Sequence, residues 1–448
     1  MLFRQEAKEL CLETDGTSFR LPQIDLPANT RVAENCNEAA LRRWGMATVC
    51  LLTRTVSQAG NTIRCIVMEA SPSGSATPAG LCWTPVGALE AAAFADPLDF
   101  SFFSGQCNQA PDSDPTLGLF AKPGSFRTIA EWVEVQAGRA GLRLTGEFRQ
   151  LNCGPRFSLI RFATDGPALW FKAVGEPNLA EFRVTAELAR LFPSYLPRIL
   201  GTRPEWNAWL AEEAGGTNLD RRFGLDNGRA AVKALAELQV ASLGQGLHLL
   251  DAGCRDARVC RLRDAIEPFL AVMGALMAQQ TANPPAPLSR DELRKLGDQI
   301  YAALTVLEDS EIQNALGHLD LNPANILVHE NRCTFLDWAE AFVGHPFLAL
   351  PYLLEHLRRV PAFERTWEKD LVEAYANTWR LYFDEEKVRS ALRVAALLAA
   401  FTYAVLLSAR NPSRQSYRAE TAKLLRSLAR RMKREAEAPR ERRAVCVP

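Results

Sequence analysis

The feature that most constrains this chain is the polar strip GHLDLNPANILVHENRCTFLDW, residues 317–338. It holds four side chains suited to acid–base or metal chemistry, His318, Asp320, Asn325 and Asp337. The runs ILVH and CTFLD predict two strands joined by a turn. Such a hairpin brings Asp337 back beside Asn325 and leaves Asp320 in the loop before the first strand. The strip therefore predicts one amide and two carboxylates at one point.

This combination of groups suits phosphoryl transfer. That reaction needs positioning and charge neutralisation more than covalent chemistry. Asp320 can orient an acceptor hydroxyl, while Asn325 and Asp337 supply oxygen ligands for Mg²⁺. Taken one at a time, the same residues also suit an ordinary turn, because Asp and Asn are common turn formers. The strip alone leaves both interpretations open.

The motif HLDLNPANIL followed by FLDW resembles the catalytic strip of the aminoglycoside phosphotransferase and choline kinase family, small-molecule relatives of the protein kinases. The family pattern is His-x-Asp-x-x-x-x-Asn, then Ile-Asp-Trp or a near variant. The resemblance implies that Asp320 is the catalytic base, that His318 buttresses its loop, and that Asn325 and Asp337 bind Mg²⁺. It also implies ATP as the donor and a small-molecule hydroxyl as the acceptor.

A kinase of this kind needs a strand lysine that contacts phosphates and a helix glutamate that holds it. ALWFKAVG places Lys172 in an apolar strand, where an ammonium without a partner is costly. The following segment, AEFRVTAELARLF, offers Glu181 and Glu187. We expect Glu187 to be the partner, because ELARLFPSYLPRIL resembles the helix, loop and strand of the family more closely.

Two further nucleotide contacts follow from the resemblance. WLAEEAGG predicts that the backbone of Glu212 and Glu213 contacts adenine, with Gly215 and Gly216 as the exit from the hinge. LNCGPR offers a single glycine, Gly154, for the phosphate-covering loop. Backbone N–H groups in such a turn can still bind phosphate.

The strip and the segment that follows it differ from related kinases at three points. GHPFLAL has Ala349 where the family often has an aspartate that anchors the catalytic loop. Asn322 replaces the lysine that protein kinases have two residues after the base, and DWA replaces their DFG. A protein substrate is therefore not expected, and Ala349 raises the question of what else anchors the loop.

Along the chain we predict an α+β fold, in which a bilobal protein-kinase-like domain follows a small α+β domain. The predicted parts are an α+β domain at 1–108, a linker at 109–124, a β-rich small lobe at 125–216, a helical large lobe at 217–410, and a basic helix and tail at 411–448.

The first part informs least about function. Its predicted hairpin, MATVCLLTRTV and NTIRCIVMEA, together with GLCWTPVGALE, weakly resembles the periphery of a Nudix fold. The Nudix box with its metal carboxylates is absent from the sequence, so no pyrophosphatase activity is expected. A regulatory or substrate-shaping module is the interpretation that remains.

Composition excludes several classes of protein. Lys and Arg balance Asp and Glu at 52 each, so no overall charge favours nucleic acid or membrane partners. The eleven cysteines include no CxxC pair, and together with a charged start they predict reduced thiols in a cytoplasmic protein. The apolar run at 394–407 is shorter than a bilayer span and predicts a buried helix. Oligomeric state is left open.

Together these features predict an ATP-dependent phosphotransferase acting on an alcohol of a small molecule. The alternative is a nucleotide-binding pseudokinase or regulatory scaffold without turnover. Among acceptors, an aminoglycoside predicts an acidic pocket, for which Glu355, Glu364 and Asp370 are available. A choline-like acceptor predicts aromatic side chains that face the cation instead.

Overall fold

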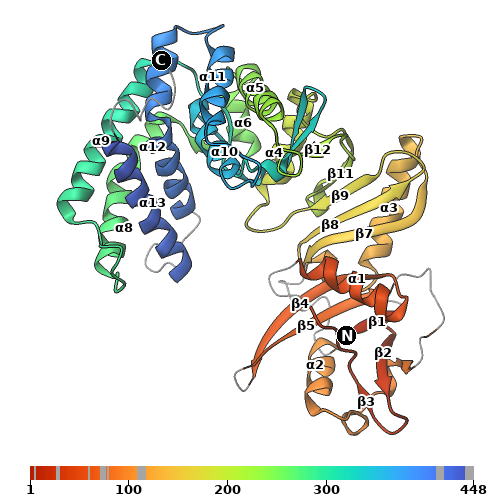
Figure 1. The fold of residues 1–448 in the computed structure, drawn as a ribbon. Helices are drawn as coiled ribbons and strands as arrows, with labels where there is room; N and C mark the ends of the chain where they lie inside the picture. The colour runs from red at the N-terminus through yellow and green to blue at the C-terminus, as the bar shows by residue number, and fades with distance from the viewer. Residues whose placement is uncertain are drawn as a thin grey trace. The chain divides into compact units, whose positions relative to one another are not determined.

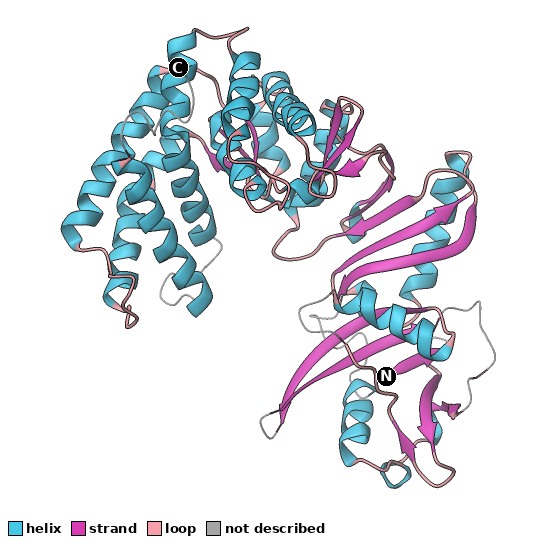
Figure 2. Ribbon diagram, viewed as in Figure 1, coloured by secondary structure: helices cyan, strands magenta, loops and turns pink. Residues whose placement is uncertain are grey.

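The computed structural model describes residues 1–4, 7–26, 31–58, 61–70, 77, 80–107, 118–409 and 418–438. The chain forms two compact units. Unit 1 comprises Met1–Phe182 and Arg198–Glu213, and unit 2 comprises Arg183–Pro197 and Ala214–Pro448. Figures 1 and 2 show that most strands belong to the first unit and most helices to the second.

The first sheet of unit 1 has the strand order β3-β2-β1-β5-β4, with β6 paired to β2. Its strands are β1 (Leu2–Arg4), β2 (Glu9–Thr14), β3 (Phe19–Arg20), β4 (Thr48–Gln58), β5 (Asn61–Ala70) and β6 (Leu81–Pro85). The antiparallel pairing of β4 with β5 confirms the predicted hairpin. Helices α1 (Val32–Trp44) and α2 (Pro97–Cys107) complete this part.

The second sheet of unit 1 has the order β10-β11-β9-β8-β7, and every pairing is antiparallel. Its strands are β7 (Leu144–Gly154), β8 (Phe157–Thr164), β9 (Leu169–Ala173), β10 (Ile199–Arg203) and β11 (Ala208–Glu212). Helix α3 (Ser125–Arg139) packs on this sheet, with the Phe126 ring 4.3 Å from Phe148 and the Trp132 ring 6.0 Å from Phe171. Strand β9 carries Lys172, as the sequence predicted.

The two sheets of unit 1 share one hydrophobic core, which runs from Phe3 to Leu210. Gln150 on β7 is 4% exposed, and its amide replaces a backbone pairing: Nε2 donates to the Cys50 carbonyl and Oε1 accepts from the Cys50 N–H. Arg149 contacts Glu34 and Glu38 of α1. The structure therefore does not divide the chain at the predicted linker, of which residues 109–117 lie outside the described part.

Unit 2 is mainly helical, as predicted. Two small sheets, with orders β12-β15-β16 and β13-β17-β14, position the polar strip. The strands are β12 (Thr217–Asn218), β13 (Arg255–Ala257), β14 (Ala315–His318), β15 (Ile326–His329), β16 (Arg332–Phe335) and β17 (Ala341–Gly344). The sequence did not predict β13 or β17.

The helices of unit 2 enclose a single large core. They are α5 (Leu225–Ala241), α6 (Gly246–Ala252), α7 (Val259–Asp264), α8 (Ile266–Ala278), α9 (Arg290–Asp309), α10 (Leu350–Leu357), α11 (Trp367–Trp379), α12 (Glu385–Ala409) and α13 (Ala419–Glu437). Helix α4 (Ala180–Leu191) begins in unit 1 and continues into unit 2. In Figure 1, α8, α9, α12 and α13 lie side by side.

Helix α12 is long and apolar enough to cross a membrane by length and composition, but 56% of its most apolar window is buried inside the protein. Leu398, Phe401 and Ala404 are fully buried, as predicted for a core helix. The basic helix α13 also packs against the core through Leu425 and Met432. The nine cysteines whose side chains the structure describes are free.

Candidate active site

The strip forms the predicted hairpin. Strands β15 and β16 pair with Ile326 opposite Phe335, and the Leu336 N–H donates to the Asn325 carbonyl at 2.9 Å. This hydrogen bond extends the hairpin by one step and places Asp337 immediately beyond Asn325. Ile326 and Phe335, which face each other across the hairpin, are both fully buried, and this fixes the register. The backbones of Asn325 and Asp337 therefore lie at the same end of the hairpin, and the shared cation site of their side chains stays a prediction.

Asp320 lies in a loop closed by hydrogen bonds to its own backbone and side chain. The Asn325 Nδ2 donates to the Asp320 carbonyl at 3.1 Å, and the Asn322 Nδ2 donates to Asp320 Oδ1 at 3.3 Å. The Ala324 N–H in turn donates to Asn322 Oδ1 at 2.9 Å. Because the nitrogen of Asn325 is engaged with the loop, its amide oxygen is the atom that remains for a cation. Asn322 holds the loop where protein kinases carry a lysine.

His318 connects this loop to the strand that carries Asp337. It is fully buried, its Nδ1 accepts the Asp320 N–H at 3.1 Å, and its Nε2 lies 3.1 Å from the Leu336 carbonyl. The first bond requires an unprotonated Nδ1, so the proton sits on Nε2 and is donated to Leu336. The Trp338 ring packs 4.8 Å from the imidazole. His318 thus buttresses the loop, as its predicted role requires.

Asp337 is exposed and adopts a left-handed backbone, with φ 63° and ψ 63°. That conformation is uncommon outside glycine, asparagine and aspartate, and it turns the chain sharply at the end of the hairpin. Within the described residues no three His, Cys, Asp or Glu side chains form a metal cluster. Magnesium in nucleotide sites is commonly held by one or two protein carboxylates plus phosphates, so the Asn325 and Asp337 pair fits that ion.

In unit 1, Lys172 on β9 pairs with Glu181, not with Glu187. The Lys172 Nζ lies 2.5 Å from Glu181 Oε1, and the two side chains are 25% and 2% exposed. The ammonium also lies 5.6 Å from the centre of the Trp209 ring. Glu187 instead contacts Arg190 and His248, each at 2.5 Å, and these partners, Arg190 first, lower the pKa of Glu187. The predicted partner was wrong.

Helix geometry explains the correction. Glu187 follows Glu181 by six residues, which is about 9 Å along the helix axis and about 120° around it. Glu181 lies on the face of α4 that also buries Val184 and Leu188. An acid on an apolar helix face needs a partner, since carboxylates are rarely buried otherwise. That helical periodicity was the sequence signal that favoured Glu181 over its more exposed neighbour.

Of the predicted hinge residues, Glu212 ends strand β11 and Glu213 follows it directly. The Glu212 N–H donates to the Arg198 carbonyl at 2.9 Å, and the Glu213 N–H donates to the Ala168 carbonyl at 2.8 Å. The side chain of Glu213 forms a bidentate pair with Arg161, which lowers the pKa of Glu213. An adenine ring bound at this segment would therefore have to pair with the backbone carbonyl oxygens of Glu212 and Glu213 or with the backbone N–H groups of the residues that follow.

Gly216, the second glycine after the hinge, is required for a steric reason. Gly216 has φ +114°, and a Cβ atom there would lie 2.7 Å from the Val328 carbonyl oxygen of the strip hairpin. The chain then forms β12, which pairs with β15, and the Asn218 Nδ2 donates to the Ala324 carbonyl at 2.6 Å. Gly216 thus allows the chain to approach the strip hairpin closely, whereas a Cβ atom at Gly215 would make only an ordinary contact with His329, at 3.8 Å.

Gly154 ends β7 in a tight turn rather than in an extended loop. Phe157 pairs directly with Gly154, so that only Pro155 and Arg156 lie between the two strands. A Cβ atom at Gly154 would lie 2.2 Å from the Phe157 ring, which explains the need for glycine. Proline has no N–H, so this turn offers few backbone donors for phosphate. The predicted phosphate contact of Gly154 stays a prediction.

Ala349 is fully buried between two helical segments. The segment that leads to it is held by neutral hydrogen bonds: the Gln239 Nε2 donates to the Pro346 carbonyl at 2.8 Å, and the Tyr375 hydroxyl donates to Gln239 Oε1 at 2.6 Å. The loop of Asp320 is held by His318 and by the pairing of β14 with β17. An aspartate at position 349 is therefore not needed to anchor that loop here.

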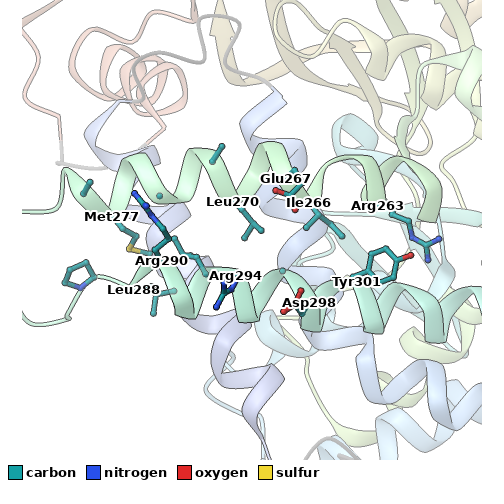
Figure 3. Close-up of a pocket in the computed structure, with 16 residues that line it drawn as sticks. Arg263, Ile266, Glu267, Leu270, Met277, Leu288, Arg290, Arg294, Asp298 and Tyr301 are labelled. Carbon is teal, nitrogen blue, oxygen red and sulfur yellow. The ribbon is translucent and has the colours of Figure 1, made fainter.

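A cavity of about 460 Å³ in unit 2 is lined by Asp320. Of the three acids considered for an acidic pocket, Glu355 lines this cavity, whereas Asp370 contacts Arg229. Figure 3 shows a second, more open cavity of about 940 Å³ between α8 and α9, lined by Leu270, Arg294 and Tyr301 among others. No predicted catalytic residue lines that second cavity. The first cavity is therefore the candidate acceptor site.

The phosphotransferase enzyme family, abbreviated APH, matches residues 175–391 of this chain. Residues 175–391 belong to that family. This stretch contains Glu181 and the whole strip, so the family assignment includes the residues on which the resemblance was based. The N-terminal part of the chain has no family assigned. No curated protein matches the chain.

Several solved structures are similar to this chain. The macrolide 2'-phosphotransferase MphH from Brachybacterium faecium is 20% identical, with 66% of this chain and 97% of that one covered and a TM-score of 0.42. A choline/ethanolamine kinase family protein from Mesorhizobium loti is 17% identical, covers 70% and 97%, and has a TM-score of 0.46. Choline kinase LicA from Streptococcus pneumoniae is 12% identical, covers 68% and 99%, and has a TM-score of 0.43.

Proposed function

We propose that this phosphotransferase moves the γ-phosphoryl group of ATP to a hydroxyl group of a small molecule. The observation that carries the proposal is the geometry of the strip. His318 joins the loop of Asp320 to the strand of Asp337, and the hairpin places Asp337 immediately beyond Asn325. Because phosphoryl transfer depends on positioning, a structure that holds Asp320, Asn325 and Asp337 in place in this way supports the proposal.

Each residue has one task in this proposal. Asp320 orients the acceptor hydroxyl and receives its proton. Asn325 and Asp337 hold Mg²⁺, which when bound neutralises charge on the phosphates. Lys172, held by Glu181, contacts the phosphates of the nucleotide, as such a lysine does in kinases. Gly154, Glu212 and Glu213 remain proposed nucleotide contacts.

The test is an ATP-consumption screen of the full chain over aminoglycosides, amino alcohols, sugars, nucleosides and hydroxy acids. The Asp320→Ala variant serves as the blank, because it removes the base but leaves the buried His318 buttress in place. We expect acceptor-dependent ADP formation in the wild type and none above background in the variant. A pseudokinase or scaffold would bind Mg-ATP in both proteins and turn over no acceptor in either.

A further inference from the structure

The cavity beside Asp320 has walls of two kinds. Its apolar side comes largely from α12 and α13, which contribute Ala399, Leu406, Leu424 and Leu428. Tyr352 also lines the cavity, and its hydroxyl donates to the Ala399 carbonyl at 2.7 Å. A ligand with an apolar body gains affinity from such a surface by leaving water.

The charged side is not acidic. Three arginines line it, at positions 255, 359 and 431, against two carboxylates besides Asp320, at positions 340 and 355. Arg255 pairs with Glu340 at 2.8 Å. Glu355 is shared between Arg359, at 2.7 Å, and Arg431. One carboxylate between two guanidinium groups leaves one positive charge in excess at that end of the cavity.

His356 lines the same cavity and contributes no charge near pH 7. Burial, and then the neighbouring Arg359, lower its pKa, while the charge of Asp320 acts in the opposite direction. The imidazole is therefore neutral near pH 7. A polycationic acceptor would be repelled by the arginines of this cavity. Besides Asp320, the carboxylates that line it, Glu340 and Glu355, are already paired with arginines, so the cavity is not the acidic pocket that such an acceptor needs.

We propose that the acceptor is an alcohol with an apolar body and a single acid group, which binds at Arg359 and Arg431 while its hydroxyl faces Asp320. The inference rests on the proposed function for the identity of the site, and it names the class of acceptor. It argues against aminoglycosides and choline-like amino alcohols for this chain. A guanidinium pair shared with one carboxylate is suited to a second carboxylate or to a phosphate.

Three matched probes test the charge preference. 8-Hydroxyoctanoate, 1,8-octanediol and 8-amino-1-octanol share one chain and one hydroxyl, and differ at the far end. Their dissociation constants for the full chain can be measured by saturation-transfer NMR without ATP, so the result does not depend on turnover. We expect the hydroxy acid to bind about tenfold more tightly than the amino alcohol, and its affinity alone to weaken as NaCl is added.

Two variants of opposite sign separate this preference from damage to the fold. Arg431→Gln should weaken binding of 8-hydroxyoctanoate several-fold, whereas Glu355→Gln should strengthen it, and neither should change binding of the diol. The control is Arg434→Gln, which removes the same charge from the exposed side of α13. A merely structural role for the pair would weaken binding of all three probes in both variants.

The inference is overturned if the amino alcohol or the diol binds as tightly as the hydroxy acid. It is also overturned if the hydroxy acid does not bind at millimolar concentration. None of these results touches the phosphotransferase assignment, which depends on turnover. Conversely, absence of turnover with every acceptor would remove the proposed function while the binding order still held.

Discussion

The strip and the lysine of this phosphotransferase are fixed by different interactions. Asp320, Asn325 and Asp337 are held by hydrogen bonds between groups close in sequence, most of them neutral, with the imidazole of His318 between them. Lys172 is held by an ion pair that reaches from strand β9 to a carboxylate that is 2% exposed. Neutral bonds keep geometry at low electrostatic cost, whereas a buried ion pair depends on both of its members.

The largest effect on stability should come from breaking the ion pair. Lys172→Met takes away the ammonium but leaves the buried Glu181 carboxylate, which should lower the free energy of unfolding by about 3 kcal/mol. Adding Glu181→Leu to the same variant should recover most of that loss, because no buried charge then remains. Urea unfolding followed by tryptophan fluorescence measures both. Wild-type stability in the single variant would show that the pair does not stabilise unit 1.

The neutral linkage should be next in size. His318→Phe keeps a ring against Trp338 but removes the acceptor for the Asp320 N–H and the donor to Leu336. Two partly buried groups then lose a partner, so we expect a loss of about 2 kcal/mol and a larger fall in kcat than in ATP affinity. His329→Phe, at an exposed histidine of the same strip, is the control and should match the wild type. Equal effects of the two substitutions would contradict the buttress.

Acid should weaken the neutral network of unit 2 near pH 6. Burial lowers the pKa of His345 to about 3, while its Nδ1 accepts the Phe347 N–H. The unfolded chain therefore binds a proton below about pH 6.5 that the folded chain does not. As the pH decreases below this value, the free energy of unfolding decreases by about 1.4 kcal/mol per pH unit until the folded pKa is reached. From pH 7 to pH 5 the loss should be about 2 kcal/mol. The same titration of His345→Gln should lack this part, and parallel pH profiles would contradict it.

The smallest effect should come from the glutamate that the sequence favoured. Glu187 contacts Arg190 and His248, which are 63% and 50% exposed, so Glu187→Ala should change stability by less than about 1 kcal/mol. It should also leave the KM for ATP unchanged, while Glu181→Ala should raise it. If the two variants raised KM equally, the assignment of Glu181 as the lysine partner would be wrong.

These contrasts explain what the sequence could predict. The strip is largely local: the hydrogen bonds of Asn325 and Asn322 to Asp320, and those of His318 to Asp320 and Leu336, join residues within the segment 317–338. The pairing of β14 with β17 and the amide of Asn218 add support from outside that segment. Strand alternation and a short turn therefore sufficed to place them. The partner of Lys172 was different, because two glutamates on one helix were candidates and only the position of the helix decides between them.

Other features depended on contacts between distant segments. The anchoring of the segment before Ala349 needs Gln239 and Tyr375, which are 136 residues apart and share no motif with the strip. The pair of arginines around Glu355 needs Arg431 from α13, which the sequence suggested only as part of a basic tail. The packing of the N-terminal part onto β7 needs Gln150, a polar residue that periodicity alone treats as exposed.

The central claim is tested most directly by transfer of label from [γ-³²P]ATP to an acceptor found in the screen. Wild type, Asp320→Ala and Asp337→Ala should be compared, with circular dichroism to confirm that each is folded. We expect labelled acceptor from the wild type and a loss of at least about a hundredfold in each variant, the lower end for removal of a general base. Labelled acceptor formed at the wild-type rate by either folded variant would contradict the account.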